Sequence, residues 1–296
     1  VVFNPNGKKV VEPAKAPERE ITLDENWSIS YPGQDTIYKT AARADFSREK
    51  TINEDKLKPG YDDREWRSNS FILGKKSPTG NTRYLQEAIK KEDAPDNYIY
   101  WRTNIPPGSR TMLFSPNMNG TDVWIDGKKF VLANNSIELP ANARLLAFAR
   151  LIDKEQLPTF PMAFVVTGKD NCPLESWYAY GLEQYTGYID YERVINTRET
   201  GSAITLDLGS VKFMAEIFVN DKSVGARLWP PYKFDISREL KQGENKIRVR
   251  VGNLSVSSMR IQDDMGKLRG WGWRDIPDFE QCDAGLFGPV KLIVTK

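Results

Sequence analysis

Apolar and polar residues alternate with a period of two along several short stretches of the chain. Ile204, Leu206 and Leu208 are separated by single polar residues, and residues 247–251 and 290–294 repeat the pattern. This period places successive side chains on opposite faces of a strand, so that one face packs on a core and the other meets solvent. The three stretches are therefore predicted to be half-buried β-strands.

Turn signals separate the predicted strands. Residues 126–127 (Asp-Gly) and 220–221 (Asn-Asp) predict hairpin turns, because these residue types tolerate positive φ angles, and residues 242–245 predict a third turn. Helix is expected at only two places, a short amphipathic helix at 83–92 and a single turn at 236–240. Many short strands with frequent turns indicate β-sandwiches, so the predicted fold class is all-β.

An internal repeat predicts two similar domains. Residues 108–131 and 201–225 each contain two strand-like stretches joined by a turn. Each copy follows a segment with aromatic and basic residues, 100–102 in the first half and 191–193 in the second. Self-similarity of this kind indicates that one structural unit occurs twice.

The domain boundaries follow from the repeat and from the length of 296 residues, which suits two domains of ordinary size. We expect the first β-sandwich at residues 21–166 and the second at 167–296, with a Gly/Asp/Asn/Pro segment at 167–173 between them. Residues 1–20 are expected to be a linker from an upstream region, since the chain opens on Val1 without an initiator Met.

Composition narrows the choice of partners. The net charge of +2 comes from 42 basic and 40 acidic residues spread along the chain, with no basic stripe. Nucleic acid and anionic membrane are therefore not expected partners. Apolar stretches such as residues 161–166 are far shorter than a membrane span. Aromatic residues make up 11%, which fits both sandwich cores and sugar-stacking surfaces.

The reactive side chains are few. The sequence contains no histidine, which excludes Ser-His-Asp and Cys-His catalysis and every imidazole metal site. The two cysteines, Cys172 and Cys282, stand near the ends of the second half. They form either a disulfide between the first and last strands of that sandwich or two buried free thiols.

The second half resembles the galactose-binding-like jelly rolls of multidomain glycoside hydrolases, above all the C-terminal region of large α-L-rhamnosidases. Several motifs carry this resemblance through their order and spacing. They are residues 182–191, 206–209, 217–225, 228–236, 240–245 and 285–290. The resemblance implies a jelly-roll β-sandwich and a carbohydrate partner, with rhamnose-containing polysaccharide as the substrate of the parent enzyme.

The first half resembles the sugar-binding domain of β-galactosidase and β-glucuronidase relatives, on residues 23–27, 61–66, 100–102 and 122–128. Residues 115–118 depart from the family pattern. The two resemblances together imply two tandem galactose-binding-like sandwiches. In that family the catalytic carboxylates belong to a separate α/β barrel, and nothing here resembles that barrel. No catalytic residue is therefore carried over, and an upstream catalytic domain is the implied partner.

Two tryptophans separated by one glycine are the leading candidates for sugar contact. The indole rings of Trp271 and Trp273 can stack on pyranose rings, while Arg274 and Asp275 can bond sugar hydroxyls. The alternative is that both indoles cover the edge of the sandwich under a long loop. The sequence leaves both interpretations open.

A second aromatic segment, which contains Trp229 and Tyr232 around two prolines, is also a candidate for sugar binding. Consecutive prolines interrupt ladder hydrogen bonds and suit an edge strand or a crossover. In the families that the chain resembles, this segment is part of the scaffold. The structural interpretation is therefore favoured over the binding one.

Hydrolysis of a glycosidic bond needs two carboxyl groups on either side of that bond, roughly 5–10 Å apart. Glu183, Asp263 and Asp264 are the candidates, but solvated loop or turn-capping roles are favoured for all three. Jelly rolls of this type often hold a structural Ca²⁺. No Asp-x-Asp-x-Asp loop locates such a site, so the metal ligands are unassigned.

The sequence thus predicts a non-catalytic accessory region, for carbohydrate binding or scaffolding, of a secreted or periplasmic glycoside hydrolase. Two alternatives remain. One is a stand-alone carbohydrate-binding or adhesion module, and the other is a glycosidase that acts alone through a carboxylate pair.

Overall fold

The computed structural model describes residues 18–39, 41–45, 49–70, 97–114, 118–151, 162–182, 185–197, 203–253 and 283–295. These residues form antiparallel strands and one short 3-10 turn, η1 (Glu54–Leu57), which confirms the predicted all-β class. The helix expected at 83–92 lies outside the described residues. Within the described residues, no helix has the length and apolar character to cross a bilayer.

The first sandwich combines a six-stranded sheet, in the order β5-β4-β6-β11-β8-β9, with a four-stranded sheet, β10-β7-β12-β3. Its strands are β3 (Thr36–Lys39), β4 (Ala41–Asp45), β5 (Arg67–Ser70), β6 (Tyr98–Asn104), β7 (Thr111–Leu113), β8 (Asp122–Ile125), β9 (Lys128–Val131), β10 (Ser136–Glu138), β11 (Leu145–Leu151) and β12 (Met162–Val165).

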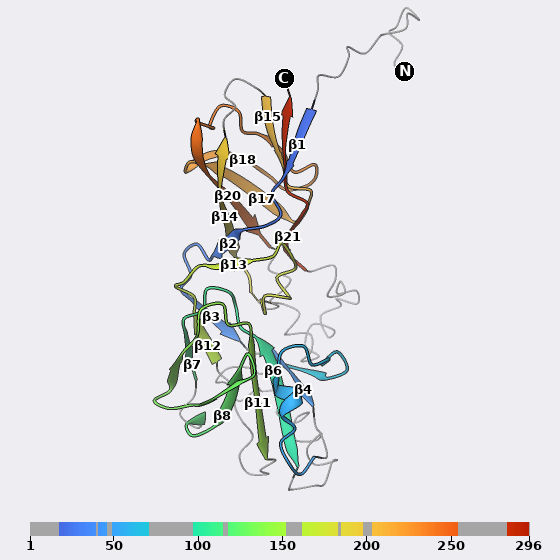
Figure 1. The fold of residues 1–296 in the computed structure, drawn as a ribbon, viewed down its shortest axis with the longest axis vertical. Coiled ribbons are helices and arrows are strands. Elements are labelled where there is room, and N and C mark those ends of the chain that lie inside the picture. Colours follow the sequence, from blue (N-terminus) through green and yellow to red (C-terminus); the bar gives the residue numbers. More distant parts are fainter. Residues whose placement is uncertain are drawn as a thin grey trace, which may run out of the picture.

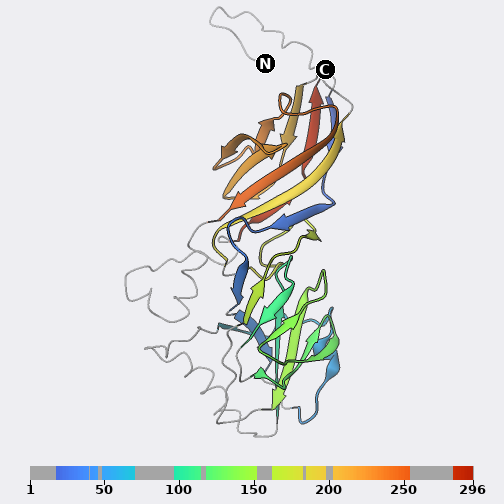
Figure 2. The same cartoon turned by 90° about the vertical axis from the view of Figure 1, so that its left-hand side faces the viewer.

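The second sandwich has the sheet orders β13-β2-β14-β20-β17-β18 and β1-β22-β15-β19, with a two-stranded sheet β16-β21. Its strands are β1 (Glu18–Thr22), β2 (Trp27–Ser30), β13 (Asp170–Cys172), β14 (Tyr188–Thr197), β15 (Ala203–Asp207), β16 (Ser210–Lys212), β17 (Met214–Val219), β18 (Lys222–Arg227), β19 (Lys233–Asp235), β20 (Gly243–Gly252), β21 (Gly285–Gly288) and β22 (Lys291–Thr295). The two sandwiches lie end to end along the long axis (Figures 1 and 2).

The chain's first two strands belong to the second sandwich, not to the first. β1 pairs with β22 along its whole length, from Glu18 opposite Thr295 to Thr22 opposite Lys291, and β2 lies between β13 and β14. Figure 1 shows these blue strands among the yellow to red ones. The first sandwich is therefore inserted between β2 and β13. This pairing differs from the expected division at 21–166 with a linker before it.

The physical reason for the difference is that a strand's partner is not encoded in its own pattern. A short alternating stretch indicates which face is apolar but not which distant edge it joins. The turns, in contrast, are local. Asp126 and Gly127 connect β8 and β9, and Asn220 and Asp221 connect β17 and β18, all with positive φ, as predicted for hairpins.

The burial pattern agrees with the predicted half-buried strands. Ile247, Val249 and Val251 of β20 are fully buried, while the residues between them are not. Three tryptophans, Trp27, Trp101 and Trp177, are among the largest fully buried side chains. A continuous hydrophobic cluster runs through both sandwiches, so the core extends from one sandwich into the other.

Candidate functional site

The two described members of the predicted sugar-binding set have different environments. Trp229 lies in the connection from β18 to β19 and is 70% exposed. Tyr232 is buried, and its hydroxyl donates a hydrogen bond to the backbone oxygen of Phe213. Burial leaves the Tyr232 ring no free face for a sugar, so this residue anchors the loop while Trp229 stays open to solvent.

The other predicted contacts lie outside the described residues. These are Trp271, Trp273, Arg274 and Asp275, together with Cys282 and the acidic candidates Glu183, Asp263 and Asp264.

Cys172 is a buried free thiol in the structure. Burial raises the pKa of this thiol to about 12, so it is protonated at neutral pH and a weak nucleophile.

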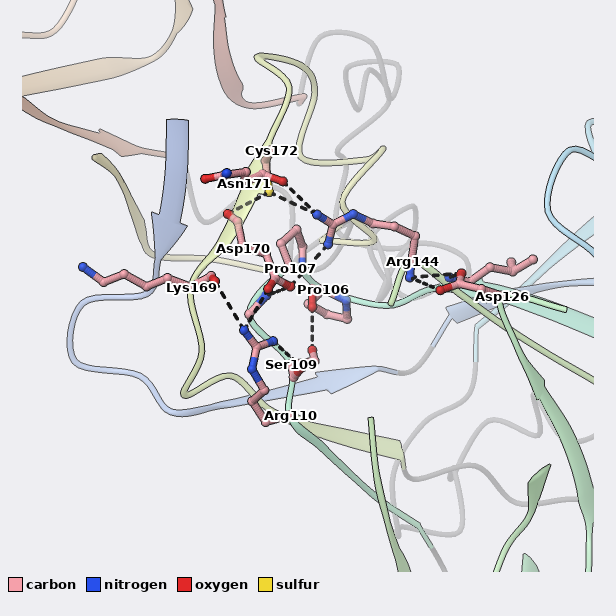
Figure 3. A network of polar contacts seen from close by, with 12 residues as sticks. Pro106, Pro107, Ser109, Arg110, Asp126, Arg144, Lys169, Asp170, Asn171 and Cys172 are labelled. Carbon is pink, nitrogen blue, oxygen red and sulfur yellow. Dashed lines mark hydrogen bonds and ion pairs between the residues drawn. The ribbon is translucent and has the colours of Figure 1, made fainter. Parts of the chain in front are cut away.

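A buried carboxylate joins the two sandwiches. Asp170 begins β13 of the second sandwich, and its Oδ2 accepts a hydrogen bond from the backbone N–H of Gly108 at 2.8 Å. Its Oδ1 accepts from Nη2 of Arg110 at 2.8 Å, and Nη1 of Arg144 lies 3.5 Å from Oδ2. The three partners come from loops of the first sandwich, and Figure 3 shows Arg110 and Arg144 directed at Asp170. One side chain thus links both domains.

The backbone segments that carry Gly108 and Gly168 approach each other closely at the junction. The N–H of Gly168 donates to the carbonyl oxygen of Gly108 at 2.9 Å. Gly108 has a φ of +82°, and a Cβ atom there would lie 2.6 Å from the carbonyl oxygen of Gly168. Both the left-handed backbone and the close approach require glycine at this position.

Arg144 extends the network to the edge of the first sandwich. Its Nη2 donates to the backbone oxygen of Asn171 at 3.0 Å and lies 3.7 Å from the Cys172 sulfur. Its own backbone N–H donates to the carboxylate of Asp126 in the β8–β9 hairpin (Figure 3). The arginine therefore fixes β13 against the start of β11 and against that hairpin.

The electrostatics of the junction favour the ionised form of Asp170. Burial by itself raises the pKa of Asp170. The hydrogen bonds from Arg110 and Gly108, with the positive charges of Arg110 and Arg144, outweigh burial and lower the pKa below its ordinary value. A carboxylate in this state has no proton to donate at neutral pH, and its burial keeps it away from solvent. The Asp170 site therefore stabilises the junction and is not suited to acid catalysis.

A second buried acid of the described residues is also bound by two arginines. Asp190 accepts from Nε and Nη2 of Arg250, at 2.8 and 3.0 Å, and from Nη1 of Arg248 at 3.2 Å. Within the described residues, Asp170 and Asp190 are the buried carboxylates, and each is ion-paired with two arginines. The described residues also contain no group of three or more cysteine or acidic side chains placed to hold a metal ion.

Sequence reasoning missed the junction. Asp170, Arg110 and Arg144 stand in short polar segments that look like solvated loops, and Asp170 is 60 residues from Arg110. The available local signal was the pair of glycines, Gly108 and Gly168, which marks backbone that approaches closely.

Comparison with known proteins finds a similarity over part of the chain. No model of a known protein family matches it. A "Putative beta-glucuronidase" of Formosa agariphila is 34% identical over 156 residues, which covers 41% of this chain and 13% of that protein. Over that part of its length the chain is related to a glycoside hydrolase. It spans only about an eighth of the relative.

Two solved structures show a weaker likeness. The rhamnosidase of Novosphingobium sp. PP1Y is 16% identical, with a TM-score of 0.35, and the match covers 71% of this chain and 26% of that one. The β-glucuronidase of Bifidobacterium dentium is 20% identical, with a TM-score of 0.31, over 39% of this chain and 22% of that one. At these TM-scores neither likeness bears on the function of the chain.

Proposed function

We propose that this chain is a non-catalytic accessory region of a glycoside hydrolase, which supports the catalytic domain and contacts the glycan. The observation that carries the proposal is the relation to a "Putative beta-glucuronidase" of which the chain covers only 13%. A segment of that size in a much larger enzyme leaves most of the relative for other domains.

The architecture supports a scaffold role. The first sandwich is inserted into the second, and the Asp170 carboxylate of the second sandwich binds donors from the first. Two domains joined in this way behave as one rigid spacer. Because the buried carboxylates Asp170 and Asp190 are neutralised by arginines, neither is free to act as an acid or a base in hydrolysis.

The carbohydrate role is proposed for aromatic side chains. Trp229 is exposed, and Trp271 and Trp273, with Arg274 and Asp275, remain candidates for sugar contact. The proposed partners are an upstream catalytic domain and a polysaccharide, with rhamnose-containing glycans as substrate of the parent enzyme. A secreted or periplasmic location follows from a polymeric substrate. A structural Ca²⁺ remains part of this proposal.

Hydrolysis assays on aryl glycosides test the proposal. The chain alone should not release the chromophore from an aryl β-glucuronide or an aryl α-L-rhamnoside, whereas the parent enzyme should. Removing this chain from the parent should lower the enzyme's thermal stability or its action on polymer more than its action on the aryl glycoside. Turnover by the chain alone, abolished in Asp263→Asn or Asp264→Asn, would establish the rival in which this chain is itself the glycosidase.

A further inference from the structure

The six-stranded sheet of the second sandwich has an outer face that takes no part in the core. Tyr191 and Val249, register partners at the centre of β14 and β20, are fully buried. The neighbouring pair, Asp190 and Arg250, therefore points away from the core, as does Tyr188 two residues earlier. Tyr188, the first residue of β14, is 46% exposed, a large exposed area for an aromatic ring on an interior strand.

A glycine seats the Tyr188 ring against the sheet. Gly252 is the register partner of Tyr188, and a Cβ atom there would lie 2.7 Å from Cε1 and 2.9 Å from Cδ1 of the ring. It would also lie 3.1 Å from Cγ of Met214 on the far side. The φ of Gly252 lies outside the left-handed range, so no turn requires glycine here. Glycine inside a strand marks close approach, and here the approaching group is an aromatic ring.

A charged pair on the neighbouring strands lies on the same face as this ring. The guanidinium carbon of Arg250 lies 5.9 Å from the Tyr188 ring centre. Nε and Nη2 of Arg250 are fixed by the buried Asp190, and Nη1 has no hydrogen bond to any described residue. Glu216 of β17 faces Arg250 across the strand pair. A donor therefore lies beside the exposed aromatic ring, and an acceptor is paired with that donor on the next strand.

We propose that this surface, Tyr188 with Arg250 and Glu216, is a binding platform for a neutral glycan. The C–H face of a pyranose stacks on an aromatic ring, and each sugar hydroxyl both donates and accepts hydrogen bonds. A guanidinium and a carboxylate side by side match neighbouring hydroxyls. Asp190 and Glu216 balance the charges of Arg248 and Arg250, so an acidic sugar would gain no surplus positive charge and would meet Glu216. The inference rests on the proposed function, because it assigns a surface and a sugar class to the carbohydrate role.

Affinity electrophoresis of the full chain tests the platform. The gels contain galactan, xylan or mannan as neutral probes, or polygalacturonate or dextran sulfate as acidic ones. We expect a neutral probe to retard the wild-type chain and Tyr188→Ala to weaken the apparent affinity roughly fivefold or more, since stacking is lost. Tyr188→Phe keeps the ring and should retain binding. Val194→Ala is the matched control, because Val194 is 57% exposed further along β14.

A second variant keeps the test informative. Gly252→Ala keeps the tyrosine at position 188 but displaces its ring. It should weaken retardation as Tyr188→Ala does. Thermal unfolding checks that the variant is folded. Retardation that is unchanged in Tyr188→Ala overturns the platform, while wild-type retention still supports a carbohydrate role. Retardation by acidic probes alone, or by no neutral probe, also overturns it. The accessory role in a larger enzyme is then judged separately, from the aryl glycoside assays.

Discussion

Asp170 and Arg110 are 60 positions apart in the chain, yet the carboxylate of one accepts a hydrogen bond from Nη2 of the other at 2.8 Å. Asp170 stands at the start of β13 in the second sandwich, and Arg110 precedes β7 in the first. The pair crosses the point where the inserted sandwich returns to its host. It is therefore one of the contacts that hold the two domains together.

Replacing Asp170 with Asn should lower the free energy of unfolding by about 2–3 kcal/mol. Removing one partner of a buried ion pair costs about 3–5 kcal/mol, but Arg110 and Arg144 are each about one-third exposed, so solvent screens part of the loss. Urea denaturation at pH 7 measures the change. Asp62→Asn removes the same charge from an exposed pair with Arg64 and should leave the midpoint unchanged. Equal effects in both variants would contradict a special role for the junction.

The contribution of Asp170 to stability should decrease as the pH falls. Its pKa in the folded protein lies below the ordinary value of about 3.9, because the donors from Arg110 and Gly108 outweigh burial. The folded state thus binds fewer protons at Asp170 than the unfolded state, and stability is gained above the unfolded pKa. The difference between wild type and Asp170→Asn should be constant above about pH 5 and shrink below about pH 4. Urea midpoints from pH 3 to pH 7 measure it, and a difference that grows in acid would refute this sign.

Gly108→Ala should be more destabilising than a glycine replacement with the same backbone angle elsewhere. Gly108 and Gly120 have φ angles of +82° and +81°, but a Cβ at Gly108 would lie 2.6 Å from the oxygen of Gly168, whereas nothing lies within 4 Å at Gly120. Gly120→Ala should cost about 1 kcal/mol for the left-handed backbone, and Gly108→Ala about 2 kcal/mol more for the clash. Thermal or urea unfolding of the two variants isolates the close approach.

Cys172 should resist alkylation in the native protein. Its thiol is buried and its pKa is raised to about 12 by burial, so little thiolate exists at pH 8. Iodoacetamide followed by peptide mass mapping should label Cys172 only after unfolding in urea. Labelling in urea without a reductant is expected, because the structure contains a free thiol. Labelling that requires a reductant would establish the disulfide with Cys282 that the sequence also allowed.

The strands and hairpins were predictable because their causes are local. Ile247, Val249 and Val251 are buried as their alternation predicts, and the turn residues Asp126 and Asn220 have the positive φ that their side chains tolerate. The burial of Tyr232 was less predictable. Tyr232 lies close to Trp229 in sequence, and only the three-dimensional path of the loop separates the buried ring from the exposed one.

The junction and the outer platform depend on long-range pairing, which no local pattern encodes. Asp170 meets Gly108 only because β13 returns beside β2 after the inserted sandwich. In the same way Arg250 meets Asp190 only through the register of β14 with β20. Charged residues at alternate strand positions indicate a solvated face, but they do not indicate which charges become neighbours.

The pairing of β1 with β22 distinguishes a strand from the expected linker at Glu18–Thr22. A chain that begins at Leu23 lacks Glu18–Thr22, and with it the five register pairs to β22. We expect its free energy of unfolding to fall by about 2–4 kcal/mol relative to a chain that begins at Glu18, since several ladder hydrogen bonds are lost, each worth about 1 kcal/mol. The loss also leaves β22 as an exposed edge strand, so the shortened chain should associate more readily in sedimentation experiments. Urea unfolding of the two chains at equal concentration measures the first effect. Equal stability would mean that these residues connect domains without contributing to the sheet, because a linker can be removed without loss of core or ladder contacts.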